Sequence, residues 1–175
     1  LGVLFYGNTH AFLAGYPRAS HIISCVLLAQ DDAGMQRDYW YTAARVPEEL
    51  DDLAQVGRRA AERAVARLGA RQLSTRRAPV LFAADMARGF FGHLVSAVRG
   101  SSQYRRSSFL LDAVGEQLLP EFVQMRERPH LRRALASSPF DAEGVTTRDR
   151  ELVKDGVLQG YVLGSYSARK LGLRT

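Results

Sequence analysis

The segment from Pro47 to Gly69 constrains the fold most, because the signals at its two ends agree with the pattern between them. Proline opens it, acidic residues crowd its first turns, arginines crowd its last turns, and glycine follows its end. This polarity complements the dipole of a helix, and proline and glycine are favoured at these two positions. A helix is therefore predicted from Pro47 to about Leu68. Its core-facing stripe, at spacings of three and four, would be Leu50, Leu53, Gly57, Ala61, Ala64 and Leu68.

Residues 1–45 have the pattern of antiparallel strands separated by turns. Apolar runs alternate with turn signals, and the runs lie at residues 1–6, 9–15, 20–30 and 35–45. The loop 31–34, Asp-Asp-Ala-Gly, joins the last two runs and predicts a hairpin. In the returning strand Tyr39 and Tyr41 share one face and Trp40 lies on the other. For these aromatic residues we favour a packed sheet face over a base-stacking platform.

A change of composition at residues 70–79 separates two parts of the chain. This stretch is polar and basic and ends on proline, as connecting segments do. We therefore predict two subdomains, residues 1–75 with the sheet and the long helix, and residues 76–175. Together the strands and helices predict an α+β fold in which helices pack on antiparallel β-sheet.

The second part of the chain holds shorter patterns. Asp85 is a good N-cap for a helix that runs to Val98, with an apolar stripe of Met86, Phe90, Leu94 and Val98. The dipeptide Asp155-Gly156 predicts a tight hairpin. The other expected elements are a strand at 80–83, an interrupted helix at 103–119, a strand at 122–128, a loop at 137–147, strands at 151–153 and 157–162, and a helix at 166–171.

Composition and charge exclude several classes of protein. The 175 residues are 46% hydrophobic and 24% charged, which excludes a disordered tail, a collagen-like repeat and a disulfide-stapled miniprotein. The net charge is +6, and 22 of the 24 basic residues are arginine, seven of them between Arg58 and Arg77. These arginines suit either a nucleic-acid face or a solvated helix face. Because no nucleic-acid motif accompanies them, we favour the solvated face.

Targeting and redox signals are few. The longest apolar stretch, Ile22–Ala29, is far shorter than the roughly 18 residues of a membrane span, so we expect no membrane segment. Cys25 lies in that stretch and is expected to be a small buried hydrophobe, which agrees with a reducing, cytoplasmic setting. The chain opens on Leu1, and both ends run directly from predicted elements, so we expect an internal piece of a longer chain.

The residues themselves offer one candidate site and no catalytic residue. The four histidines are too far apart in sequence for a helical zinc pair, and no metal is expected to be bound by this segment. Asp141 and Glu143 flank a small residue before Gly144, in a predicted loop. Carboxylates two residues apart in an extended segment project to the same side, where they could bind a cation, a peptide amine or an arginine. The alternative is an Asx-type turn with a solvated glutamate.

Five runs of the sequence together resemble the TldD/PmbA family, and in particular its PmbA (TldE) type. They are GMQRDYWYTAAR, RRAPVLFAADMARGFFGHL, SSFLLDAVGEQL, SSPFDAEGVTT and VLQGYVLGSYSARKLGL. FDAEGV with the downstream SYSARKLG is a specific combination, and the resemblance covers nearly the whole segment. Members are described as modulators of DNA gyrase and as metallopeptidases, and they are more than twice as long as this chain. Residues 1–75 would then be the middle part of such a chain, and residues 76–175 the start of its C-terminal metallopeptidase-like domain.

The resemblance implies a two-subunit protease, TldD with TldE, that trims unfolded peptides, including a microcin precursor and an antitoxin. Zinc is expected in the TldD-type subunit, on a helix with the motif HExxxH, in which two histidines bind the metal. Placed on this sequence, the motif falls where Ala84, Asp85 and Gly89 stand. Alanine and glycine have no lone pair to donate, so this chain would be the zinc-free partner of a TldD-type subunit, or of itself in a dimer. Asp141, Glu143 and Gly144 match a shared DxEG element, which would then brace the substrate cleft.

Two alternatives remain open at this stage. One is an independently active peptidase that uses residues outside this segment. The other is direct action on DNA gyrase or nucleic acid, which the family's name and the net charge of +6 suggest.

Overall fold

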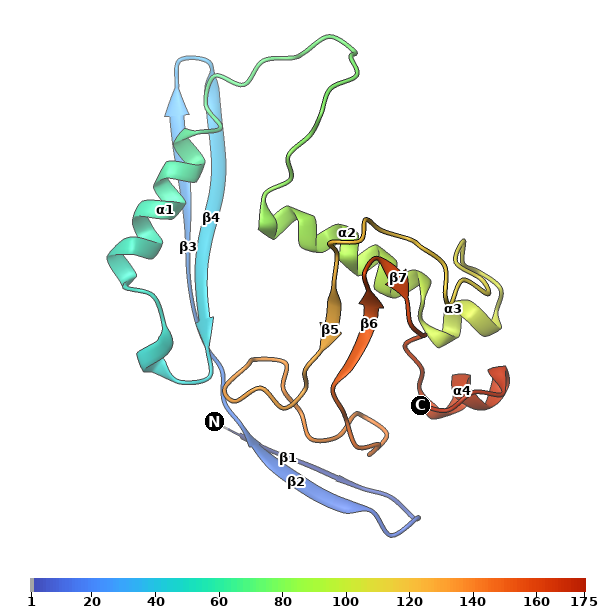
Figure 1. The fold of residues 1–175 in the computed structure, drawn as a ribbon. Coiled ribbons are helices and arrows are strands. Elements are labelled where there is room, and N and C mark those ends of the chain that lie inside the picture. The colour runs from blue at the N-terminus through green and yellow to red at the C-terminus, as the bar shows by residue number, and fades with distance from the viewer. Residues whose placement is uncertain (1) are drawn as a thin grey trace. The chain divides into compact units, whose positions relative to one another are not determined.

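The computed structural model describes residues 2–175, and it confirms the α+β class predicted from the sequence (Figure 1). Its elements are β1 (Gly2–Gly7), β2 (Leu13–Arg18), β3 (His21–Asp31), β4 (Gly34–Ala44), the 3₁₀ helix η1 (Pro47–Glu49), α1 (Leu53–Val65), α2 (Ala84–Ala97), α3 (Gly100–Tyr104), β5 (Met125–Glu127), β6 (Arg150–Lys154), β7 (Val157–Leu158) and α4 (Ser165–Leu171). They form two compact units. Unit 1 extends to Arg77 and includes Leu131–Ser137, and unit 2 comprises Ala78–His130 and Ser138–Thr175.

Unit 1 contains two antiparallel hairpins; the second was predicted from the loop 31–34, whereas the strand expected at 9–15 is displaced to β2, Leu13–Arg18. β1 pairs with β2, and β3 pairs with β4 along their whole length. The predicted first strand began at Leu1, which lies outside the described residues. The turn between β3 and β4 is shorter than the predicted four-residue loop, because Asp31 Oδ1 accepts hydrogen bonds of 2.9 Å from the backbone N–H groups of both Ala33 and Gly34. This local bond extends both strands to the turn itself.

The long helix of unit 1 begins later than predicted. Pro47–Glu49 is a separate 3₁₀ turn, and α1 starts only after Asp52, whose side chain accepts a 3.0 Å hydrogen bond from Gln55 N. An aspartate favours the N-cap over the helix interior, which explains the break. The predicted stripe was wrong at Leu53, which is 61% exposed, and of its other members only Ala64 is fully buried, while Leu50, Gly57, Ala61 and Leu68 are half-buried. Instead the residues that α1 buries are small, namely Val56, Ala60 and Ala64.

Trp40 and Asp38 of β4 explain why α1 carries so many arginines. The guanidinium groups of Arg59 and Arg63 lie 5.2 and 5.3 Å from the centre of the Trp40 ring, within the range of cation–π attraction. Asp38 accepts hydrogen bonds from Arg63 at 3.3 Å and from Arg67 at 3.5 Å. The backbone N–H of Tyr39, followed by Arg63, holds the pKa of Asp38 below its usual value. Arg59 and Arg63 of α1, with Arg67 just beyond its end, therefore attach the helix to the β3–β4 hairpin.

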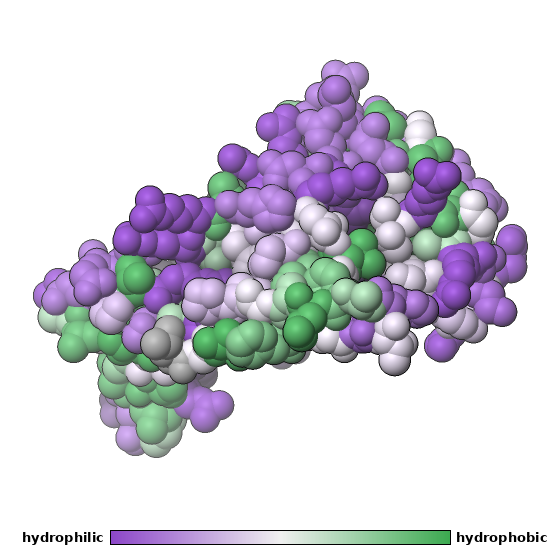
Figure 2. All heavy atoms as spheres, turned by 90° about the horizontal axis from the view of Figure 1, so that it is seen from below, coloured by the Kyte–Doolittle hydropathy of each residue, from purple (hydrophilic) through white to green (hydrophobic). Residues whose placement is uncertain are grey.

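The face of the β3–β4 hairpin opposite α1 is open in unit 1. Tyr39 and Tyr41 share this face as predicted, with ring centroids 6.3 Å apart, and both are exposed. Exposed aliphatic residues continue it, namely Ile22, Val26, Leu28 and Met35. Apolar side chains also reach the surface elsewhere, as the green areas of the space-filling view show (Figure 2).

Residues 131–137 belong to unit 1 although they are distant in sequence. The guanidinium group of Arg45 donates hydrogen bonds to the carbonyl groups of Ala134, Leu135 and Ser137, at 3.1, 2.9 and 3.0 Å. Arg133 adds an ion pair of 2.8 Å with Glu49. Arg45 thus satisfies backbone carbonyl groups of this irregular segment that have no strand partner.

Unit 2 is built on a three-stranded antiparallel sheet in the order β5-β6-β7. The turn at Asp155-Gly156 joins β6 and β7, as predicted. Gly156 has a φ of +75°, and a Cβ there would lie 2.0 Å from the carbonyl oxygen of Leu119, so only glycine fits. Buried side chains from the end of α2, from the turns between α3 and β5, and from β6 and β7 form one core cluster, comprising Ala97, Val98, Leu110, Ala113, Leu152, Val153 and Leu158.

Several predictions for unit 2 were wrong. Residues 80–83 form no strand, and the N-cap of α2 is Ala83 rather than Asp85, which lies in the first turn. Met86 and Phe90 are exposed, but the second half of the predicted stripe is confirmed, because Val98 is buried and Leu94 packs against the core cluster. Residues 105–119 form turns rather than a helix, and the strand expected at 122–128 is limited to β5.

The described residues contain no helix that is both long and apolar enough to cross a membrane.

Candidate functional site

The acidic loop Asp141–Val145 of unit 2 is an Asx-type turn. Asp141 Oδ1 accepts hydrogen bonds of 2.9 Å from the backbone N–H groups of both Glu143 and Val145. The backbone closes the same turn, because the N–H of Asp141 donates to the carbonyl of Val145 at 2.9 Å. Gly144 has a φ of +80°, a conformation that favours glycine. The turn therefore accounts for Asp141 and Gly144 of this element, but not for the side chain of Glu143.

Glu143 binds the start of α4 rather than water alone. Its Oε2 atom accepts a 2.7 Å hydrogen bond from the backbone N–H of Ser165, the first residue of that helix. This hydrogen bond, with a second from the Ser165 side chain and the nearby charge of Arg169, holds the pKa of Glu143 below its usual value. Gly164 leaves room for the carboxylate, since a Cβ there would lie 3.3 Å from Oε1. The glutamate joins two segments that are 22 residues apart.

Asp141 also lies on the wall of a cavity of about 530 Å³ in unit 2. Thr147, Arg148 and Arg150 line the same cavity, whereas Glu143 and Gly144 do not. Arg150 is engaged within the wall, because it pairs with Glu127 and donates a 2.9 Å hydrogen bond to the carbonyl of Tyr161. Sequence reasoning missed these two arginines. Their spacing in TTRDRE was the available signal, because residues two apart in an extended segment face the same side.

The position assigned to the lost zinc motif is the first turn and a half of α2. Ala84 is the first residue of the helix, Asp85 follows it, and Gly89 lies further along. The side chains of Ala84 and Gly89 have no atom that could bind a metal, so only the carboxylate of Asp85 would remain. One carboxylate is too few for a zinc site, so the residues at these positions do not fit zinc. Within residues 2–175, His, Cys, Asp and Glu nowhere gather in a group of three that could hold a metal ion.

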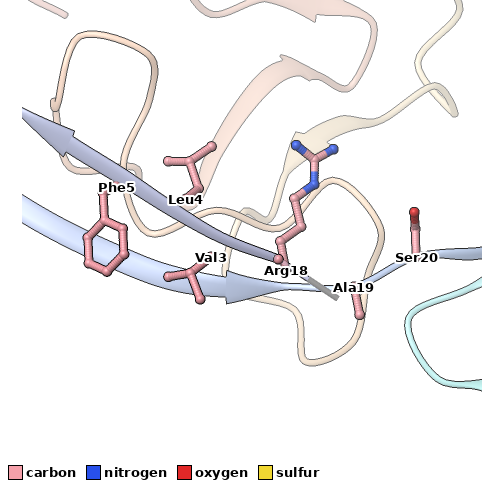
Figure 3. Close-up of a pocket in the computed structure, with 7 residues that line it drawn as sticks. Val3, Leu4, Phe5, Arg18, Ala19 and Ser20 are labelled. Atoms are coloured by element: carbon pink, nitrogen blue, oxygen red, sulfur yellow. The ribbon is translucent and has the colours of Figure 1, made fainter.

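The β1–β2 hairpin of unit 1 borders another hollow, of about 590 Å³. Leu4 and Arg18 project to one side of this hairpin, and Val3 and Phe5 project to the other (Figure 3). Arg18 is the one titratable side chain on its lining. Ser20 adds a hydroxyl group, but among the described residues the lining has no side chain that could act as its base, so we assign the hollow no chemistry.

Two family models match this chain in adjoining stretches. The PmbA/TldA metallopeptidase central domain matches residues 2–68, and the PmbA/TldA metallopeptidase C-terminal domain matches residues 75–175. Among similar proteins, "Metalloprotease PmbA" of Escherichia coli O157:H7 is 48% identical over 174 residues, which are 99% of this chain and 39% of that protein. A "Metalloprotease PmbA homolog" of Haemophilus influenzae is 45% identical over 98% of this chain and 38% of its own length. The chain thus spans about two fifths of the length of these relatives.

Solved structures show the same fold. A candidate modulator of DNA gyrase from Thermotoga maritima has a TM-score of 0.87 at 26% identity, and the match covers 97% of this chain and 39% of that one. TldE of Thermococcus kodakarensis has a TM-score of 0.72 at 21% identity over 95% of this chain and 38% of its own, a likeness of fold alone. On the two matching family models and the identity to the relatives, this chain belongs to the PmbA/TldD metallopeptidase family.

Proposed function

We propose that this chain is part of the PmbA (TldE) type subunit of a two-subunit metalloprotease, and that it completes a peptide cleft without holding zinc itself. The observation that carries the proposal is the set of side chains at the start of α2. Ala84 and Gly89 stand at the positions where a TldD-type chain would supply histidines, and they leave only the carboxylate of Asp85. The zinc is then expected in a TldD-type partner.

The DxEG loop gives this subunit a defined wall for the cleft. Asp141 organises the turn through two backbone N–H groups, and Glu143 attaches the turn to α4. Since the cavity beside Asp141 holds about 530 Å³, it can receive several atoms of an extended peptide. In this proposal Asp141, Glu143 and Gly144 position the wall and take no part in proton transfer.

The substrate class proposed is an unfolded peptide, such as a microcin precursor or an antitoxin, that the pair shortens or matures. Relatives named metalloprotease support a peptidase role for the complete protein. The working assembly proposed is a dimer with a TldD-type chain, or with a second copy where that chain is absent.

The test is to purify the full-length protein alone and with a TldD-type partner, and to measure zinc content and cleavage of an unfolded peptide. We expect zinc to accompany the partner, and cleavage to require both chains. Asp85→Asn in this chain is expected to leave zinc content and cleavage unchanged, while replacing a histidine of the partner's motif abolishes both. Stoichiometric zinc and cleavage by the full-length protein alone would instead establish an independent peptidase.

Direct action on DNA gyrase or nucleic acid is the competing function, since some solved relatives carry that name. The arginine-rich stretch from Arg58 to Arg77 gives this function little support. Three of its arginines, Arg59, Arg63 and Arg67, contact Trp40 and Asp38 within unit 1. We expect no binding of duplex DNA near physiological ionic strength. Binding that weakens steeply as salt is raised would favour the competing function.

A further inference from the structure

A second cavity of unit 2, of about 730 Å³, adjoins the one beside Asp141. The two share Arg148, Arg150, Leu163 and Thr175 on their linings, so they are neighbouring cavities. The second cavity differs in its walls, which combine aliphatic side chains, Leu111 and Leu173, with arginines. A cavity lined in this way suits an amphipathic ligand that carries negative charge.

Three arginines of this cavity are available to such a ligand. Arg106 and Arg174 have no carboxylate partner within ion-pair distance among the residues that the structure describes. Arg148 donates only a long hydrogen bond of 3.4 Å, to the carbonyl of Thr175. By contrast Arg150 is satisfied by Glu127 and by the carbonyl of Tyr161.

The acidic residues of the same wall do not neutralise these arginines. Glu151 is already paired with Arg126 at 3.1 Å and lies 3.8 Å from Lys154. Among the described residues on this lining, Asp112 is then the one carboxylate that remains to face three guanidinium groups. The cavity therefore carries an excess of positive charge, and guanidinium groups bind carboxylates with paired, directional hydrogen bonds.

We propose that this cavity binds an acidic side chain, Asp or Glu, of an extended peptide, with Arg106, Arg148 and Arg174 on the carboxylate and the leucines on an aliphatic neighbour. The inference deepens the proposed function and depends on it for the peptide. An extended peptide suits this pair of cavities, because the one beside Asp141 shares Arg148 with this one and would receive a neighbouring residue of the same peptide.

The test measures binding without cleavage. The full-length protein, purified with its TldD-type partner and treated with a chelator, is titrated calorimetrically with two acetylated and amidated peptides. Both consist of Ser, Gly and Leu around one central residue, which is Glu in one and Gln in the other. We expect the Glu peptide to bind about fivefold to tenfold more tightly, and this preference to shrink as sodium chloride rises from about 0.05 M to about 0.5 M.

The variant Arg106→Gln/Arg174→Gln is expected to remove the preference for Glu while the Gln peptide binds as before. Arg128→Gln is the matched control, because Arg128 is an exposed arginine of the same unit outside both linings, and it should keep the preference. Thermal unfolding of all three proteins verifies that the variants are folded. Equal binding of the two peptides, absence of peptide binding, or a preference that the double variant retains would overturn this inference. None of these results would affect the proposed function, which zinc content and partner-dependent cleavage decide.

Discussion

Glu143 Oε2 lies 2.7 Å from the backbone nitrogen of Ser165, so an acidic loop and the last helix of unit 2 are joined by one carboxylate. The first N–H groups of a helix have no partner within the helix, and an anion that accepts from one of them stabilises the helix start. At the opposite end Gly172, with a φ of +67°, terminates α4. The loop singled out in the sequence thus has a structural task that its composition alone did not reveal.

Replacing Glu143 with Ala should loosen α4. We expect a loss of about 1 kcal/mol in the free energy of opening this helix, the usual effect of losing an N-terminal cap. Glu143→Gln should cost less, since an amide oxygen still accepts the hydrogen bond of Ser165. Hydrogen exchange of the α4 amides in the full-length protein measures this. Glu121→Gln, an exposed glutamate for which no ion pair is seen, serves as the control.

The same carboxylate should make α4 sensitive to acid. Because folding lowers the pKa of Glu143 below its ordinary value of 4.5, the stabilisation is fully present above about pH 4.5 and is lost as the pH falls through the folded-state pKa. Protection factors of the α4 amides should therefore fall on acidification in the native protein. Glu143→Gln should flatten this dependence, and an unchanged profile in that variant would contradict the assignment.

Asp141 should tolerate Asn but not Ala. Its side-chain oxygen accepts two backbone hydrogen bonds, and an asparagine oxygen can accept the same pair. We expect Asp141→Ala to lower the free energy of unfolding by about 1–2 kcal/mol, and Asp141→Asn to lower it by less than half as much. Urea unfolding measures both. If the loop only braces the cleft, peptide cleavage by the assembled pair should persist in Asp141→Asn/Glu143→Gln; loss of cleavage in a folded double variant would show a chemical role.

Gly100 should not accept a side chain. A Cβ at this buried position would lie 2.5 Å from Ser167 Cβ and 2.9 Å from Leu163 Cδ2, where α3 and α4 meet. We expect Gly100→Ala to destabilise unit 2 by about 1–3 kcal/mol, as overpacked sites do. Gly92→Ala is the matched change, because Gly92 lies in α2 with open space around it, and it should stabilise by roughly 0.5–1 kcal/mol. Thermal unfolding should move in opposite directions for the two variants.

Arg63 should matter more for stability than its neighbour Arg58. Arg63 contacts both the Trp40 ring and Asp38, whereas Arg58 is exposed on α1. We expect Arg63→Ala to cost about 1 kcal/mol, and Arg58→Ala to stay within about 0.5 kcal/mol of the native protein. Denaturant unfolding compares them. Equal effects would show that the arginines of α1 act as a solvated charged face instead.

Patterns confined to a few residues predicted much of this fold. Turn residues predicted the β3–β4 hairpin of unit 1, Asp155-Gly156 predicted the turn between β6 and β7, and the last helix was expected within one residue of α4. Longer elements were harder. The helix predicted between residues 103 and 119 was wrong beyond Tyr104. Leu110 and Ala113 are buried in the core, as the spacing suggested, but they reach it from turns.

The sequence by itself determined the chemistry that is missing at Ala84 and Gly89, because a side chain without a donor atom lacks one in every fold. It also determined the pairs β3–β4 and β6–β7, since turn residues act over short distances along the chain. Tertiary structure alone decided that Glu143 meets Ser165 and that Arg106, Arg148 and Arg174 line one cavity. These residues are far apart in sequence, so their contacts depend on the path of the whole chain, which no local pattern encodes.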